Sequence, residues 1–181
     1  MLRGKKVILR AMERDDLKHL HALLQHVDLV LLSHGDWQPI SLASWEKDFE
    51  KHLEDRNYHQ FVIEADGKPI GSMVLRGDAN PRSGTGRFGI GIHDPEYVGR
   101  GYGRDALETF LDWAFRMMGF RRLKLQTLAT NERALRLYEA CGFQREGLLR
   151  EDEYVDGAYR DIVVMGLLRS EWEARKRATV E

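Results

Sequence analysis

The chain has 181 residues, 43% of them hydrophobic, which fits a single domain that buries a sizeable core. Its 28 basic and 29 acidic residues almost cancel, so the overall charge indicates neither nucleic acid nor an anionic membrane as a partner. The one cysteine, Cys141, excludes an intrachain disulfide and favours a cytoplasmic location.

The N-terminal half begins with an expected strand over residues 6–12. The start of the sequence has basic residues but no sustained apolar region, so it does not resemble a signal peptide. Apolar residues then recur at helical spacing, at Leu17, Leu20, Leu24 and Val27. Residues 28–41 mix apolar residues with glycine and proline, which predicts an irregular connection, and the apolar run within it is too short to cross a bilayer. A serine-capped helix over 41–56 and a hairpin over 61–75 that turns at Asp66-Gly67 are expected next.

The C-terminal half continues with an expected strand over residues 87–92. Gly89 and Gly91 lie inside this strand, which suggests a bulge or a group packed close to the backbone. The remaining elements follow in the order of a helix from Arg104, a strand over 123–128, a helix over 131–143 and a long hairpin over 143–168.

This order of elements predicts the fold class. About seven strands alternate with helices, which indicates a mixed sheet with helices on both faces, an α/β (α+β) fold. We treat residues 1–181 as one domain, and we expect the charged residues from about 170 to 181 to form a solvated tail.

Three glycines and two arginines gather in the stretch HDPEYVGRGYGRDAL, residues 93–107, just before an expected helix. A helix N-terminus presents unpaired N–H groups and partial positive charge, and glycines let a phosphate approach the backbone. Arg100 and Arg104 could add charge-assisted hydrogen bonds. The spacing lacks the P-loop lysine, and it fits the dinucleotide fingerprint weakly because no acidic residue follows the next strand. The stretch alone leaves open both an anion site and a turn that merely caps the helix.

The same stretch resembles motif A of the GNAT superfamily of N-acetyltransferases, whose loop reads [QR]-x-x-G-x-[GA]. Val98, Gly101 and Gly103 occupy its first, fourth and sixth positions, and Val98 departs from the usual Gln or Arg. A second stretch, NERALRLYEACGF, resembles the superfamily element N-x-x-A-x-x-x-Y-x-x-x-G-F. The end of the chain resembles ribosomal-protein N-terminal and spermidine acetyltransferases. The resemblance covers nearly the whole chain and implies a mostly antiparallel GNAT-like sheet.

The resemblance also implies acetyl-CoA as co-substrate, held without a metal. The loop amides would bind the pyrophosphate, and the pantetheine arm would lie beside strand 87–92 like an added strand. The implied binding residues are Ile90, Gly91, Ile92, Val98, Gly99, Arg100, Gly101, Tyr102, Gly103, Arg104, Asn131 and Tyr138.

Tyr138 is the expected general acid, because a phenol stays protonated at neutral pH and can donate to a departing CoA thiolate. Asn131 would anchor the pantetheine by hydrogen bonding. The thioester oxygen needs a donor, for which we consider the main chain of Gly89, Ile90 or Gly91. Cys141 lies beside the glycine that ends a helix, and we interpret it as a small structural residue.

The sequence offers several candidates for the general base and for the acceptor site and does not choose among them. The candidates for the base are Glu64, His93, Asp94 and Glu96. Weak candidates for the acceptor site are His34, Asp36, Trp37 and Glu64. His19 and His26 lie two helical turns apart, too far to share one ion, so we expect no metal site there.

We therefore expect an N-acetyltransferase that moves an acetyl group to a primary amine by direct attack in a ternary complex. The leading acceptor is a protein N-terminus, and a small amine such as a polyamine, aminoglycoside or amino sugar is the alternative. A non-catalytic acyl-CoA-binding module, or a different phosphate-ligand protein, would fit the loop without the chemistry. A homodimer, common among similar proteins, is left open.

Overall fold

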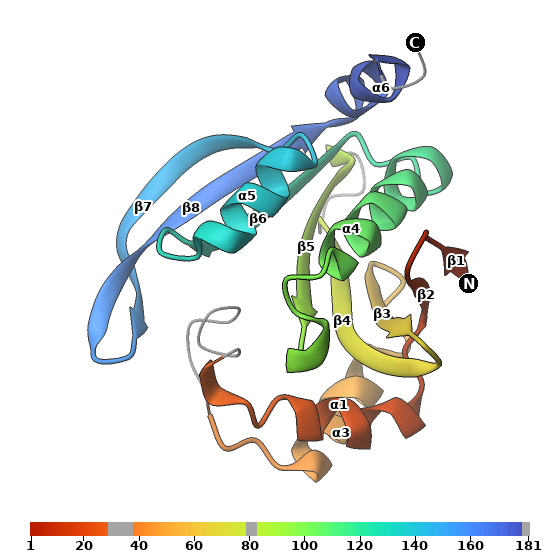
Figure 1. Ribbon diagram of the computed structural model, residues 1–181, viewed down its shortest axis with the longest axis vertical. Coiled ribbons are helices and arrows are strands. Elements are labelled where there is room, and N and C mark those ends of the chain that lie inside the picture. The colour runs from red at the N-terminus through yellow and green to blue at the C-terminus, as the bar shows by residue number, and fades with distance from the viewer. Residues whose placement is uncertain (29–37, 79–82, 179–181) are drawn as a thin grey trace.

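A computed structural model describes residues 1–28, 38–78 and 83–178, and it places the described strands in one eight-stranded sheet (Figure 1). The strand order is β1-β2-β3-β4-β5-β6-β8-β7. The strands are β1 (Leu2–Arg3), β2 (Ile8–Ala11), β3 (Tyr58–Ala65), β4 (Lys68–Gly77), β5 (Thr85–Ile92), β6 (Arg122–Leu128), β7 (Gln144–Val155) and β8 (Ala158–Leu168). All neighbours are antiparallel except β5 and β6.

Helices cover both faces of this sheet, as the order of elements predicts. They are α1 (Arg14–Leu23), α3 (Leu42–His52), α4 (Tyr102–Asp112), α5 (Glu132–Ala140) and α6 (Arg169–Ala178), with a 3-10 turn η2 (Pro95–Tyr97) and a π-helical turn η3 (Trp113–Met117). The helices α4 and α5 lie on one face, and α1 and α3 lie on the other (Figure 1). In the part of the chain that is described, no helix combines the length and apolar character needed to span a membrane.

The alternation of side chains along β5 separates the two faces of the sheet. Phe88 packs on Phe110 of α4, with ring centroids 5.2 Å apart, and Ile92 lies close to Gly103 of α4. Because side chains alternate along a strand, Gly89 and Gly91 turn toward the α1–α3 face. On that face no side chain of β5 keeps other groups away from the backbone of these two residues, and the His93 imidazole packs close to Gly91.

Strands β5 and β6 diverge, and this divergence opens the sheet. β5 pairs with β4 from Gly86 to Ile92, but with β6 only over Thr85–Arg87. Beyond Arg87 the two strands separate (Figure 1). One edge of residues 88–92 is therefore an unpaired strand edge inside an otherwise continuous sheet.

Three features differ from the sequence-based expectation. Helix α1 ends at Leu23, so Val27, expected on its apolar face, lies beyond it and is exposed. The eighth strand, β1, has two residues, too short to carry a hydrophobic pattern. The expected solvated tail is instead largely the helix α6, in which Trp172 is buried against Phe115 with ring centroids 5.4 Å apart. One aromatic residue anchors this helix, while its charged residues remain toward solvent.

An ion-pair network connects α1 to the sheet. Nη1 and Nη2 of Arg10 donate to Asp16 at 2.7 and 2.8 Å, and Nε donates to Glu64 at 2.7 Å. The Asp16 carboxylate also accepts the N–H of Glu13 at 2.9 Å, which caps the helix. Burial raises the pKa of Asp16, but the hydrogen bonds from Arg10 and Glu13 and the charge of Arg10 outweigh it, so the pKa is lowered.

Asp16→Asn should lower the free energy of unfolding at neutral pH by about 2 kcal/mol, because it leaves Arg10 poorly paired. A lowered pKa gives stability that is present above the unfolded value of about 3.9 and lost as the pH falls through the folded value. The difference between wild type and variant in urea unfolding should therefore shrink toward about pH 3. A difference that stays constant from neutral to acidic pH would contradict this account.

Candidate active site

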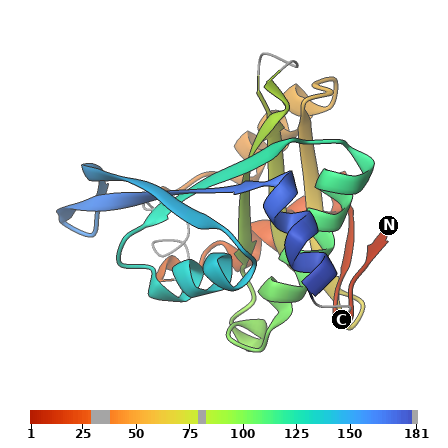
Figure 2. The same ribbon diagram turned by 90° about the horizontal axis from the view of Figure 1, so that it is seen from above.

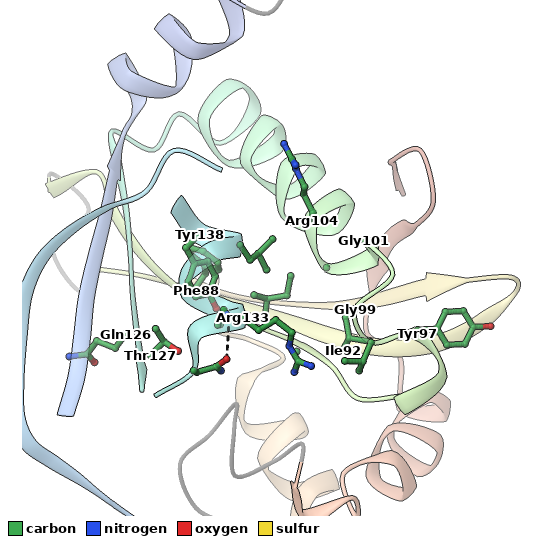
Figure 3. A pocket seen from close by; sticks show the side chains of 18 residues that line it. Phe88, Ile92, Tyr97, Gly99, Gly101, Arg104, Gln126, Thr127, Arg133 and Tyr138 are labelled. Carbon is green, nitrogen blue, oxygen red and sulfur yellow. Dashed lines mark hydrogen bonds between the residues drawn. The ribbon is translucent and has the colours of Figure 1, made fainter. Parts of the chain in front are cut away.

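A cleft of about 260 Å³ opens where β5 leaves β6 (Figure 3). Its walls come from β5, the loop of residues 98–103 that leads into α4, the end of β6 and the first turns of α5. We call residues 98–103 the glycine loop. All the expected acetyl-CoA residues line it except Arg100 and Tyr102. Gly89, a candidate donor to the thioester oxygen, also lines it. Residues that the sequence did not predict line it as well, namely Phe88, Tyr97, Gln126, Thr127, Arg133, Ala134 and Leu137.

The glycine loop presents its backbone to this cleft. Gly99 and Gly101 have φ values of 77° and 85°, in the left-handed region that favours glycine. Gly101 is the N-cap residue of α4, so the first N–H groups of this helix have no partner within it. These free N–H groups and the positive end of the helix dipole suit a phosphate group.

The N-terminal segment braces the loop from outside the cleft. The carboxylate of Asp105, in the first turn of α4, accepts the N–H groups of Lys5, Lys6 and Val7 at 2.9, 2.6 and 3.0 Å. Nζ of Lys6 donates to the carbonyl of Arg100 at 2.9 Å and lies 5.3 Å from the ring centroid of Tyr102. Arg100 and Tyr102 therefore contact this brace instead of lining the cleft.

The arginine best placed toward the loop is Arg133, which sequence reasoning missed. Nε of Arg104 donates to Glu108 at 3.1 Å, and Figure 3 shows its side chain extending along α4 away from the loop. Arg133 extends from the start of α5 toward Gly99 and Ile92 (Figure 3). The signal available in the sequence was its place in the NERA segment, one residue before the motif alanine.

Asn131 and Tyr138 both lie in the cleft and are both buried. Oδ1 of Asn131 accepts the N–H of Ala134 at 3.1 Å, which caps α5. The ring of Tyr138 packs edge-on against Phe88, with centroids 6.3 Å apart. Burial raises the pKa of Tyr138 to about 12, so the phenol is protonated throughout the neutral range. No described residue hydrogen-bonds its hydroxyl, which leaves the proton available for a bound molecule.

Cys141 does not have the properties of a nucleophile. Its side chain is fully buried, and burial raises the pKa of the thiol to about 11. A nucleophilic cysteine needs a lowered pKa and access to the substrate, so the structure supports a packing role for Cys141.

A second cavity, of about 590 Å³, lies on the opposite face of the sheet, between the sheet and helices α1 and α3. Its polar and aromatic lining includes His21, Trp45, Asp48, Tyr58, Gln60, Ser72 and His93. Strand β5 separates the two cavities, because Gly91 lines the cleft and His93 lines the second cavity.

The candidate bases are not gathered in one place. His93 is buried, and its Nε2 lies 2.9 Å from Oγ of Ser72. Glu64 is held by Arg10 and lines neither cavity. The Asp94 carboxylate accepts the N–H of Glu96 at the start of η2, and Glu96 is exposed.

The remaining expected site residues concern the acceptor and metals. His34, Asp36 and Trp37 lie outside the described residues. Nε2 of His19 lies 3.0 Å from the carbonyl oxygen of Pro69. Over residues 1–28, 38–78 and 83–178, no three or more His, Cys, Asp or Glu side chains come together in an arrangement that could hold a metal ion.

Comparisons with known proteins agree with this geometry. Residues 6–144 match the family described as "Acetyltransferase (GNAT) domain". The spermidine N(1)-acetyltransferase of Vibrio cholerae serotype O1 is 31% identical over 170 residues, covering 93% of this chain and 96% of that protein.

Solved structures agree as well. The crystal structure of the Vibrio cholerae spermidine N-acetyltransferase in complex with CoA and spermine has a TM-score of 0.86 and 30% identity, covering 94% of this chain and 99% of that one. A dodecameric structure of the Vibrio cholerae enzyme has a TM-score of 0.81 and 29% identity, over 95% and 99% of the two chains. Together with the open strand edge and the glycine loop, these matches show that the chain belongs to the GNAT acetyltransferase family and is an N-acetyltransferase.

Proposed function

We propose that this enzyme transfers the acetyl group of acetyl-CoA to a primary amine of a small polyamine. The observation that carries the proposal is the pair of cavities on the two sides of β5. The cleft beside the glycine loop, the donor cleft, has the loop and the strand edge suited to acetyl-CoA. The second cavity, between the sheet and helices α1 and α3, offers separate space for the amine and is the acceptor cavity. Direct transfer requires that both substrates are bound at the same time, and two cavities that meet at one strand provide room for both.

The donor residues have distinct roles in this proposal. The N–H groups at the start of α4 hold the pyrophosphate, and Arg133 adds a charge-assisted hydrogen bond to it. The pantetheine arm lies along the open edge of residues 88–92 in the manner of an added strand, and Asn131 anchors it. A main-chain N–H of Gly89, Ile90 or Gly91 donates to the thioester oxygen. Tyr138 protonates the departing sulfur.

A small amine fits the acceptor cavity better than a protein N-terminus, the leading expectation from sequence. Its volume of about 590 Å³ lies within the range of small-molecule sites. Trp45 supplies an aromatic ring and Asp48 a carboxylate, groups that attract ammonium ions. The similar proteins named above act on spermidine, which supports the same substrate class here.

An acceptor screen tests the proposed function. Purified enzyme is given acetyl-CoA with spermidine, spermine, an aminoglycoside or a short peptide with a free N-terminus, and thiol release is followed. The polyamines should give the highest kcat/KM. Preferential acetylation of the peptide would contradict the polyamine assignment, and CoA binding without release for any amine would indicate a non-catalytic binding module.

We also propose that the chain forms a homo-oligomer through the β7–β8 hairpin. Figure 2 shows this hairpin projecting from the rest of the molecule. β7 is an edge strand, and large apolar side chains are exposed along the hairpin at Leu148, Leu149, Tyr154 and Tyr159. Soluble proteins rarely leave such an edge uncovered.

Light scattering after size-exclusion chromatography tests this second proposal. The wild type should have a mass of two or more chains, and Leu148→Glu with Tyr154→Glu should lower it, because charge opposes burial of the hairpin. A monomeric wild type, or an unchanged mass in the double variant, would contradict an interface at this hairpin.

A further inference from the structure

We propose that Ser72 and His93 form the proton acceptor for the amine substrate. This inference rests on the proposed function and identifies the base that it requires. A polyamine arrives mainly as ammonium ions, and an ammonium nitrogen has no lone pair with which to attack a thioester. One proton must therefore leave the reacting nitrogen before the C–N bond can form.

The two side chains are held together on the acceptor side of the sheet. Ser72 of β4 lies opposite Gly91 of β5 in the antiparallel register. Its Oγ lies 2.9 Å from Nε2 of His93, an imidazole that is only 5% exposed. Both side chains line the acceptor cavity. His93 is thus buried and Ser72 is partly buried, and the two side chains lie within hydrogen-bonding distance of each other and line the space where the amine would bind.

Gly91 determines how near this pair lies to the donor cleft. A Cβ at Gly91 would lie 2.5 Å from Cε1 of His93, so the imidazole occupies the space that a side chain would fill. The backbone of Gly91 also lines the donor cleft. Only the thickness of one strand therefore separates the imidazole from the cleft in which the thioester would lie. This close packing gives the glycine inside β5 a physical reason.

The other titratable groups facing the acceptor cavity are less well placed. His21 comes from α1, with Nε2 2.7 Å from the carbonyl oxygen of Ile40, and Asp48 comes from α3, with an exposed carboxylate. Tyr58 comes from β3, where burial raises the pKa of its phenol. Asp94 follows His93 but caps η2. None of these groups is packed against the β5 backbone as His93 is.

With this pair, each proton that the amine nitrogen loses has an acceptor, and the departing sulfur has a proton donor. The Ser72 hydroxyl accepts one proton from the ammonium while donating its own to Nε2 of His93, which later releases it to solvent. The neutral nitrogen then attacks the thioester carbon, so that the C–N bond forms and the C–S bond breaks. Tyr138 protonates the sulfur, and the second proton lost from nitrogen restores the phenol.

The test compares the pH dependence of kcat/KM with spermidine for the wild type, His93→Gln and Ser72→Ala. In the wild type, kcat/KM should rise with pH and then level off, because a base of the enzyme removes the proton from the ammonium ion. In both variants kcat/KM should be about 100-fold lower than in the wild type at neutral pH. It should keep rising with pH without levelling off, because only amine that is already neutral in solution reacts. CoA affinity and thermal unfolding are measured alongside, to show that the variants remain folded.

His59→Gln is the matched control. His59 is half-buried on β3 and packs edge-on against Trp113, with centroids 5.4 Å apart, on the face away from the acceptor cavity. It should keep the wild-type pH profile. The proposal would be overturned by a folded His93→Gln enzyme with wild-type kcat/KM, or by one whose kcat/KM rises and levels off with pH as in the wild type. A wild type that acetylates no polyamine would instead refute the proposed function, so the two failures are distinguishable.

Discussion

Replacing Tyr138 by phenylalanine is expected to lower kcat by about 100- to 1,000-fold while leaving CoA affinity within about twofold of wild type. The ring fills its space between Phe88 and Phe143, and phenylalanine preserves that packing. Only the hydroxyl is lost, and the CoA sulfur must then leave as an unprotonated thiolate. Steady-state thiol release and titration with CoA measure the two quantities separately.

The control for this prediction is Tyr159→Phe, which removes a phenol that is 65% exposed on the β7–β8 hairpin. It should change neither kcat nor CoA affinity. If Tyr138→Phe kept wild-type turnover, Tyr138 would have no part in the mechanism. If it lost CoA affinity and turnover in equal proportion, its hydroxyl would act in binding and not in proton transfer.

Gly101→Val is expected to weaken CoA binding by about 100-fold or more, because two effects coincide at this position. A branched residue is strained at a φ of 85°, and its Cβ would lie 3.6 Å from Nζ of Lys6, so the rest of the side chain would crowd the contact that braces the loop. The affinity is measured by calorimetric titration with CoA, and thermal unfolding shows how much of the loss comes from instability.

Gly67→Val separates strain from crowding. Gly67 also has a positive φ, 73°, but it lies in the β3–β4 turn, where no described atom beyond its chain neighbours comes within 4 Å of the position of a Cβ. This variant should lose similar stability and keep its CoA affinity. Wild-type CoA affinity in Gly101→Val would contradict the assignment of the loop as the pyrophosphate site.

Features that depend on local backbone requirements could be predicted from the sequence. The hairpin turn at Asp66-Gly67 forms as predicted, with φ values of 51° and 73° that suit a tight two-residue turn. The glycine loop likewise precedes a helix, and its spacing to Asn131 and Tyr138 was enough to indicate the acetyltransferase family. In these cases neighbouring residues determine the conformation, so a short stretch carries the information.

Features that depend on contacts between distant segments could not be predicted. Glu64 looked like a candidate base until Arg10 of the neighbouring strand was found to pair with it. Arg104 looked like a phosphate ligand, but its side chain follows α4, while Arg133 extends toward the loop from another helix. Charged side chains choose their partners in space, and their order along the chain does not reveal that choice.

The sequence by itself determined the mixed sheet with helices, the glycine loop and the family, because these depend on periodicity and on conformations that glycine favours. Only the tertiary structure decided where the sheet opens, since that depends on how far β6 follows β5. It alone brought Ser72 and His93, 21 positions apart, within 2.9 Å of each other. Strand register sets that distance, and register is a property of the assembled sheet.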